Sequence, residues 1–312
     1  MTASDPESEP VFPLQTARGR GRRLAALGRA ILYLVLAVLS AVGASVLVKA
    51  ATHRNFIDLA HGGLADQLLG KIAFCLALVV IPTGALLLLF REPFAYSGWT
   101  GRRAGRLLGT GLVAGLGLIG LLLVLLAACG AVSLHASGAA GPGLAATLAS
   151  LGLWLAVGLL EEGADRGYFL VQLSRCLSFW PAALLTSTLF MLGHVANPGE
   201  SPAGIAAAGL IGLVLAYSFL RTGSLWFALG FHAAWDCGES FVFGVPNSGA
   251  RPDVSLLVTD LHGSPLLTGG SVGPEGSMLV FPIIALLALI VRAMLPASPA
   301  GTTKTDAGSS PA

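Results

Sequence analysis

Eight stretches of this chain are apolar for long enough to cross, or nearly cross, a lipid bilayer. A transmembrane helix needs about 20 mostly apolar residues. Only 11% of the 312 residues are charged and 54% are hydrophobic, whereas soluble domains carry about 25% charged residues. The sequence therefore predicts an all-α, polytopic membrane helix bundle with about eight transmembrane helices, near 30–48, 72–90, 107–132, 144–175, 181–196, 203–220, 224–243 and 278–295.

The chain divides by composition into two tails and two groups of helices. Residues 1–24 are polar and then arginine-rich, and residues 297–312 are small and polar, so both are predicted to be disordered tails. The N-terminal transmembrane helices occupy 25–143, and the polar motifs described below fall in 144–296. A cleaved signal peptide ending after AVGAS is an alternative for the first apolar stretch, but the long tail ahead of it favours an anchored helix.

Positive charge is spread unevenly between the predicted loops. If the N-terminus is inside, fourteen Lys and Arg residues fall on the inner side and four on the outer side, namely Lys49, Arg54, Lys71 and Arg251. Cytoplasmic loops carry the excess of positive charge, so both termini are predicted to be cytoplasmic. The net charge is only +2 and no basic surface with interleaved aromatic residues is visible, which argues against a nucleic-acid partner. The four cysteines are isolated, which indicates neither a disulfide framework nor a thiolate zinc site.

The segment 244–277 is the one long loop in the C-terminal half, and it is rich in Gly, Pro and Ser. This composition is typical of turns, so a flexible extracytoplasmic connector is one interpretation. Long loops in compact folds often serve functional sites, so a lid or substrate-guiding loop is the other. The sequence leaves both open.

Four charged residues interrupt the predicted fourth span in the stretch LLEEGADRGYFL. Glu162 and Arg166 are spaced i,i+4 with the acid first, the favourable order for a helical ion pair. Glu161 and Asp165 form a second i,i+4 pair that places two carboxylates on one face. One of the two pKa values should rise, which suits general acid–base chemistry. A helix end emerging into water is the competing interpretation, because charged residues are mostly exposed.

His194, in the predicted fifth span, favours the functional interpretation. The stretch LSFWP, 177–181, predicts a turn between the two spans. From a turn near residue 178, Glu161 is 17 residues back and His194 is 16 residues forward. Both should therefore lie ~25 Å along antiparallel helices, facing each other at matching depth.

The predicted seventh span adds His232 and Asp236, again spaced i,i+4, followed by Glu239. A single buried histidine is more often structural than a ligand. Two histidines and several carboxylates at compatible depths on three helices indicate a functional site, because intramembrane ionisable residues are costly and usually face the bundle interior.

Two chemistries suit this group of residues. Two imidazoles with carboxylates can hold a catalytic zinc ion that lowers the pKa of a bound water. Without metal, the same residues can position and deprotonate water and stabilise an oxyanion. The excess of carboxylates favours the metal route, although no HExxH motif is present.

Three motifs together resemble the CPBP family, the Rce1-like CAAX proteases and bacteriocin-processing enzymes, which are intramembrane metalloproteases. EEGADR, 161–166, is similar to the family's EExxxR motif, FMLGH, 190–194, to FxxxH, and HAAWD, 232–236, to its HxxxN/D motif. The similarity extends over roughly 145–295. Residue 236 is Asp where the better-known enzymes have Asn, and Asp165 adds a carboxylate that the motif does not require.

The resemblance implies an intramembrane endopeptidase acting on membrane-anchored peptides or proteins, here in a bacterial cytoplasmic membrane. Glu161 would activate water, Glu162 and Arg166 would organise it, and a zinc ion would have the candidate ligands Glu161, His194, His232 and Asp236. A non-catalytic membrane scaffold or immunity protein of the same fold is an alternative. An ion-coupled transporter is another, but the repeated halves and broken helices typical of transporters are not visible.

Overall fold

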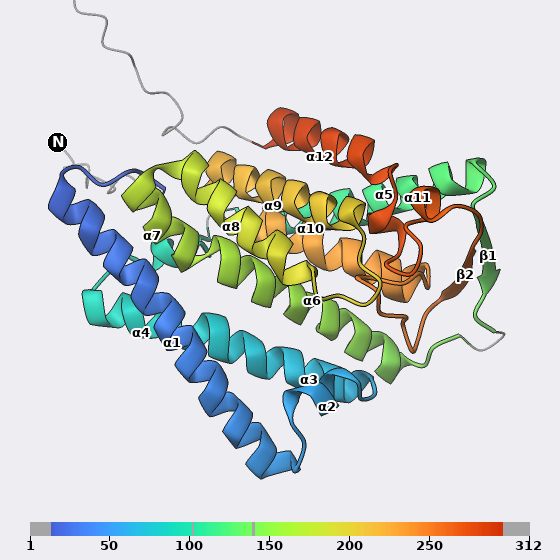
Figure 1. The fold of residues 1–312 in the computed structure, drawn as a ribbon, viewed down its shortest axis with the longest axis horizontal. Helices are drawn as coiled ribbons and strands as arrows, with labels where there is room; N and C mark the ends of the chain where they lie inside the picture. The colour runs from blue at the N-terminus through green and yellow to red at the C-terminus, as the bar shows by residue number, and fades with distance from the viewer. Residues whose placement is uncertain (1–13, 102, 139–140, 296–312) are drawn as a thin grey trace, which may run out of the picture.

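The computed structural model of the protein describes residues 14–101, 103–138 and 141–295, and nearly all regular structure in this part is helical (Figure 1). The predicted all-α polytopic membrane bundle is confirmed. Within the described residues, five helical segments are long and apolar enough to cross a membrane: Arg20–Thr52, Leu64–Phe90, Ala104–Ala128, Leu144–Leu177 and Pro202–Thr222. The other three predicted spans are shorter apolar helices packed among them.

The N-terminal group begins with α1 (Arg20–Thr52), whose first residues fall inside the range predicted as a tail. Arg, Leu and Ala favour helices, so the arginine-rich stretch extends the helix rather than ending before it. Residues 14–19 of the predicted N-terminal tail are described and are not helical, whereas residues 1–13 and the C-terminal tail lie outside the described residues. α1 carries exposed large apolar side chains, among them Leu34, Val38 and Leu47, as a lipid-facing helix requires.

A short helix, α2 (Phe56–Ala60), leads into the second span. This span is built from α3 (Leu64–Cys75), a π-helical turn (Leu76–Val80) and α4 (Ile81–Phe90). Pro82 lacks a backbone N–H, so the helix widens just before it and then continues. A 3₁₀ turn (Phe94–Ser97) then connects to α5 (Ala104–Ala128).

The predicted fourth span is two helices, α6 (Leu144–Arg166) and α7 (Tyr168–Leu177). Gly167 breaks the helix with ψ −131°, a conformation outside the helical region. The sequence did not predict this break, although the predicted span itself is present as the segment Leu144–Leu177. The predicted turn before the fifth span is present: Ser178 adopts φ 90° and α8 (Phe179–His194) runs back along α6.

The remaining helices complete the bundle. α9 (Pro202–Thr222) begins with Pro at its first position and a Ser201 side chain that accepts from Gly204 N, and it ends at Gly223 with φ 67°. α10 (Trp226–Cys237) continues into a π-helical turn (Gly238–Val242). After α11 (Pro265–Thr268) and a 3₁₀ turn (Pro274–Gly276), α12 (Val280–Met294) is the last helix described.

A two-stranded antiparallel ribbon lies at one end of the bundle. It pairs β1 (Val132–Ala136) with β2 (Leu257–Leu261) in the register Val132↔Leu261. The sequence predicts a loop over the residues of β2 and no strand at β1. The pairing joins segments more than 100 residues apart, so no local pattern could indicate it.

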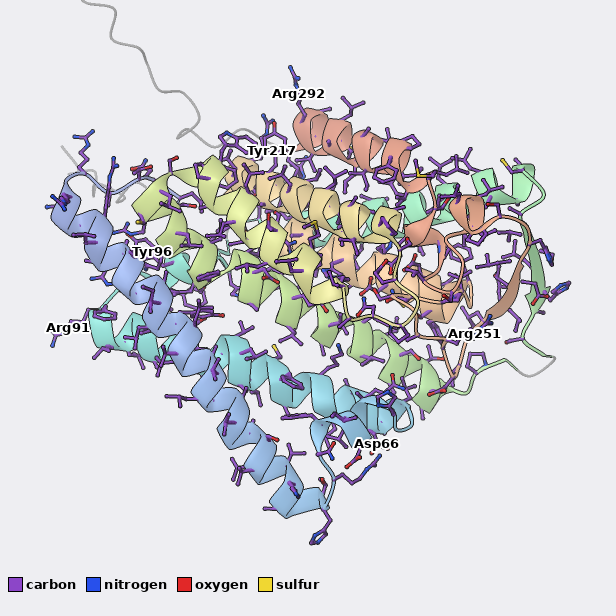
Figure 2. All side chains as sticks on the ribbon, in the orientation of Figure 1. Asp66, Arg91, Tyr96, Tyr217, Arg251 and Arg292 are labelled. Atoms are coloured by element: carbon purple, nitrogen blue, oxygen red, sulfur yellow. The ribbon has the colours of Figure 1, made fainter. Side chains whose placement is uncertain are left out.

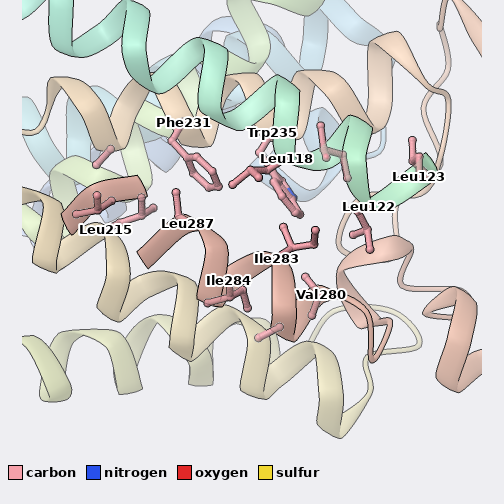
Figure 3. Close-up of a cluster of buried hydrophobic side chains, with 14 of the residues drawn as sticks. Leu118, Leu122, Leu123, Leu215, Phe231, Trp235, Val280, Ile283, Ile284 and Leu287 are labelled. Atoms are coloured by element: carbon pink, nitrogen blue, oxygen red, sulfur yellow. The ribbon is translucent and has the colours of Figure 1, made fainter. Parts of the chain in front are cut away.

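The core that positions α10 lies between α5, α9, α10 and α12 (Figure 3). Phe231 and Trp235 stack with ring centroids 5.7 Å apart and project into this core, where Leu118, Ile283 and Leu287 surround them. His232 and Asp236 each follow one of these two aromatic residues by one position. This polar pair therefore lies on a neighbouring face of α10.

Glycines allow α5 and α10 to approach closely. A Cβ on Gly111 would lie 2.3 Å from Phe227 O, and one on Gly115 would lie 2.3 Å from Phe231 O. On the other side, a Cβ on Gly230 would lie 2.3 Å from Leu108 O. This GxxxG contact holds α10 against α5 by backbone packing, the arrangement that small residues permit in membranes.

Candidate active site

A cavity of about 750 Å³ lies between α3, α6, α8, α9 and α10, with the segments 195–201 and 244–250 at its edge. Figure 1 shows α6, α8, α9 and α10 running side by side around this region. The ionisable residues that line the cavity and were singled out in the sequence are Glu161, Asp165, His194, His232 and Asp236. Three helices far apart in sequence therefore present their polar residues to one space.

The predicted ion pair between Glu162 and Arg166 is present, with Oε1 and Nη1 2.7 Å apart and both side chains almost fully buried. Arg166 also donates from Nε to Gly212 O at 3.2 Å. Its guanidinium stacks 4.6 Å above the ring of Phe190 on α8. Arg166 thus connects α6 to α8 and α9, while its charge compensates that of Glu162.

Glu162 has a second partner, His232. Nδ1 of His232 lies 2.7 Å from Oε1 of Glu162. A carboxylate can only accept a hydrogen bond, so Nδ1 carries the proton. This bond orients the imidazole and leaves Nε2 turned away from Glu162, an arrangement typical of catalytic and metal-binding histidines.

Nε2 of His232 lies between two carboxylates. It is 3.5 Å from Oε2 of Glu161 and 3.5 Å from Oδ2 of Asp236. These separations are longer than direct hydrogen bonds, so both carboxylates remain able to bind another group. The side chain of Glu161 is 27% exposed, whereas that of Glu162 is 0% exposed. The two adjacent glutamates therefore have different environments.

His194 is the last residue of α8 and is partly exposed to the cavity. Its Nδ1 lies 2.8 Å from Phe190 O, which accepts a hydrogen bond from it. Among the described residues Nε2 has no hydrogen-bond partner. The ring of Phe190 lies 4.5 Å from that of His194 and 6.3 Å, edge to face, from that of His232. Phe190 therefore contacts Arg166 and both histidines, a role that helical spacing alone did not indicate.

The donor atoms suit a zinc ion in kind, because imidazole nitrogen and carboxylate oxygen are common zinc ligands. Two ligands of one tetrahedral zinc lie ~3.3 Å apart, given bonds of about 2.0–2.1 Å, and the two separations around His232 Nε2 are 3.5 Å. In the part of the chain that the structure describes, however, no group of three or more His, Cys, Asp or Glu side chains is arranged to hold an ion. A zinc ion would require these side chains to draw closer together.

The long loop 244–277 forms one wall of the cavity through Asn247, Ser248 and Glu275. Asn247 Nδ2 donates to Oε2 of the buried Glu239 at 2.9 Å. Ser248 donates to Oε1 of Glu275 from its backbone N at 2.6 Å and from its Oγ at 2.8 Å. Burial raises the pKa of Glu275 to about 7. This contact with the cavity supports the interpretation that the long loop serves the site over the interpretation that it is only a connector.

Tight packing holds this wall in place. A Cβ on Gly273 would lie 2.0 Å from Pro246 O, and one on Gly249 would lie 2.2 Å from Pro198 O, and both glycines have positive φ. Only glycine fits at these positions without displacement. The sequence indicated turns here but did not identify Asn247, Ser248 or Glu275 as cavity residues.

Residues 143–238 match the family model described as Type II CAAX prenyl endopeptidase Rce1-like. All three motifs that suggested the resemblance, at 161–166, 190–194 and 232–236, fall within this match. No curated protein and no solved structure matches the chain. From residue 143 to residue 238, this membrane protein is therefore similar to the Rce1-like CAAX protease family.

Proposed function

We propose that this protein is an intramembrane endopeptidase that hydrolyses peptide bonds of membrane-associated substrates with a water activated by Glu161. The observation that carries the proposal is the difference between the two adjacent glutamates. Glu162 is buried and engaged by both Arg166 and His232. Glu161 lines the cavity and is 27% exposed, so it is the carboxylate positioned to receive a proton from water.

In the proposed reaction, Glu161 takes a proton from water while the water oxygen attacks the carbonyl carbon of the peptide. The carbonyl electron pair moves to its oxygen, forming a tetrahedral oxyanion. In its protonated form His232 donates from Nε2 to this oxyanion, and the Glu162 carboxylate holds the ring in place. Collapse of the intermediate breaks the C–N bond, and Glu161 returns the proton to the leaving amine.

The dimensions and walls of the cavity support a peptide substrate. About 750 Å³ accommodates several residues of an extended chain. Apolar side chains such as Leu153, Trp154 and Leu189 line it beside the polar groups. This mixture suits a segment that leaves the bilayer at the site of cleavage.

We further propose that a zinc ion assists the reaction, with Glu161, His194, His232 and Asp236 as the residues available to hold it. When bound, it would lower the pKa of the attacking water towards 7 and polarise the carbonyl. His232 would then hold the ion through a deprotonated Nε2, and the ion would replace the hydrogen bond from His232 to the oxyanion. The free Nε2 atoms of both histidines support this assignment.

The proposed setting is a bacterial cytoplasmic membrane with both termini in the cytoplasm. The distribution of fourteen against four positive residues supports this orientation. The substrate is proposed to be a peptide or protein anchored in the same bilayer.

The test is cleavage of a library of membrane-anchored peptides by the purified full-length protein, comparing the natural sequence with Glu161→Gln. We expect Glu161→Gln to fold and accumulate normally and to reduce cleavage at least a hundredfold, because it removes a general base. Zinc measured on the same samples tests the metal proposal separately. A wild-type protein that binds these peptides and cleaves none would favour the scaffold alternative, and full activity of Glu161→Gln would refute the assigned base.

A further inference from the structure

A second cavity, of about 410 Å³, lies where the start of α5 meets the ends of α9 and α12. None of its lining residues lines the candidate active site. Its polar lining consists of Arg103, Arg106, Thr110 and Arg221, and its apolar lining of Leu107, Ala293, Met294 and Leu295. The cavity therefore combines positive charge with an apolar wall.

The charge of this cavity is uncompensated within the described residues. Three arginines line it, and no described lining residue is acidic. Arg103 and Arg106 are exposed. In the part of the chain that the structure describes, none of the three forms an ion pair, whereas Arg29, Arg54 and Arg166 do. Three guanidinium groups around one space attract an anion, and their planar donor sets match phosphate.

Hydrogen bonds between the surrounding segments hold the arginines at the same end of the bundle. Thr100 Oγ1 donates to Gly223 O at 3.0 Å, and Ser224 Oγ donates to Thr100 O at 3.1 Å. The turn between α9 and α10 is thereby fixed to the segment just before α5. Arg221 precedes this turn and Arg103 follows that segment, so their positions are linked.

Arg221 also fixes the end of α12. Its Nη2 donates to Arg292 O at 3.0 Å and also to Leu295 O. Its Nε is buried and has no partner in the described structure. The side chain of Arg292 itself points away from the bundle in Figure 2. Arg221 is therefore a structural residue of the cavity, and the exposed Arg103 and Arg106 are the ones free to bind.

Two tryptophans beside the turn between α9 and α10 indicate the depth of this end of the bundle. Trp99 and Trp226 flank the same turn, with ring centroids 5.3 Å apart in an edge-to-face arrangement. Tryptophan is enriched where membrane meets water, at the level of lipid headgroups. The exposed Met294 gives the cavity an apolar border towards the lipid.

We propose that this cavity binds a phosphate group, supplied by the headgroup of an anionic phospholipid. The arginines contact the phosphate, and the glycerol and upper acyl region lies against the apolar wall. Basic pockets between transmembrane helices bind lipid headgroups in this way. The inference is independent of the proposed peptidase activity.

The test measures lipid binding by the full-length protein in nanodiscs that contain phosphatidylglycerol or only phosphatidylcholine. The variant is Arg103→Gln/Arg106→Gln, and the control is Arg20→Gln/Arg22→Gln, which removes the same charge from exposed positions on α1. We expect the first pair to weaken phosphatidylglycerol binding roughly thirtyfold, which corresponds to about 2 kcal/mol. The control should retain wild-type affinity. Arg221 is left unchanged because it supports α12.

Two results would overturn the site: an equal loss of affinity in both double variants, or no preference of the wild type for phosphatidylglycerol. A third measurement tests the binding of inorganic phosphate to the same protein. If inorganic phosphate binds at millimolar concentration through Arg103 and Arg106 and phosphatidylglycerol does not displace it, the phosphate site stands but its assignment to a lipid is wrong. Displacement of the bound phosphate by phosphatidylglycerol supports the lipid.

Discussion

Nδ1 of His232 on α10 lies 2.7 Å from Oε1 of Glu162 on α6, and the same carboxylate oxygen lies 2.7 Å from Nη1 of Arg166. One buried carboxylate therefore joins two helices 70 residues apart and orients the imidazole at the same time. Glu162 therefore has a supporting role, whereas the neighbouring Glu161 remains open to the cavity.

The first prediction concerns the buried ion pair. Arg166→Ala should destabilise the protein by about 3–5 kcal/mol, because it leaves the Glu162 charge buried without compensation. Thermal unfolding and accumulation in the membrane measure this effect. Arg22→Ala, at an exposed position on α1, is the control and should change neither. Normal accumulation with full activity in Arg166→Ala would show that the pair has no supporting role.

The second prediction concerns Asp236, which lies 3.5 Å from Nε2 of His232. If zinc is bound, Asp236→Asn should weaken its retention by about 10–100-fold, the usual effect of removing a carboxylate from or next to a metal site. The two side chains are nearly the same size, so the fold should persist. Peptidase activity and bound zinc should be measured side by side. Unchanged or higher activity in a metal-free protein would rule out the metal proposal, because neutral Asn donates a hydrogen bond that ionised Asp cannot.

The third prediction concerns the close contact between α5 and α10. Gly111→Leu should lower accumulation and activity together, because even a Cβ there would lie 2.3 Å from Phe227 O. Forced overpacking typically costs about 1–3 kcal/mol, and α10 carries both His232 and Asp236. Gly109→Leu on the same helix is the control, since a Cβ there meets nothing within 4 Å. Equal effects of the two substitutions would contradict the packing argument.

The fourth prediction concerns pH and the loop that walls the cavity. Burial raises the pKa of Glu275 to about 7 from its usual value of 4.5. The folded protein therefore binds more protons than the unfolded chain between pH 4.5 and 7, and stability should fall as pH rises through this range. Backbone hydrogen exchange in residues 244–277 should accelerate over the same pH range, because burial and the nearby Asp236 both disfavour the ionised Glu275 carboxylate.

Glu275→Gln keeps this position neutral and should abolish that pH dependence. Asp253→Asn removes an exposed acid from the same loop and should leave it intact. His194 and Asp236 line the same cavity as Glu275. If Glu275→Gln kept the full pH response, the effect would belong to another group of the cavity and not to Glu275.

Much of the architecture was predictable because it depends on local patterns. The length of each apolar stretch indicates a membrane helix without reference to its neighbours. The Glu162–Arg166 pair follows from i,i+4 spacing on one helix. The turn at Ser178 follows from the break in hydropathy around LSFWP, and it brought Glu161 and His194 to the same cavity.

Other features could not be predicted because they depend on how distant segments meet. The ribbon between β1 and β2, the wall formed by Asn247 and Glu275, and the arginine-lined cavity each join parts of the chain that are far apart. The break at Gly167 is local, but glycine is also tolerated within membrane helices, so the residue alone did not reveal it.

The sequence by itself determined that this protein is a helical membrane bundle with an Rce1-like set of polar residues, because hydropathy and helical spacing are properties of each segment alone. Only the tertiary structure decided which glutamate is buried against His232 and which one faces the cavity. Glu161 and Glu162 are adjacent on one helix and differ by a rotation of about 100°. Their roles therefore depend on which side of α6 meets α10, and backbone packing between helices sets that contact.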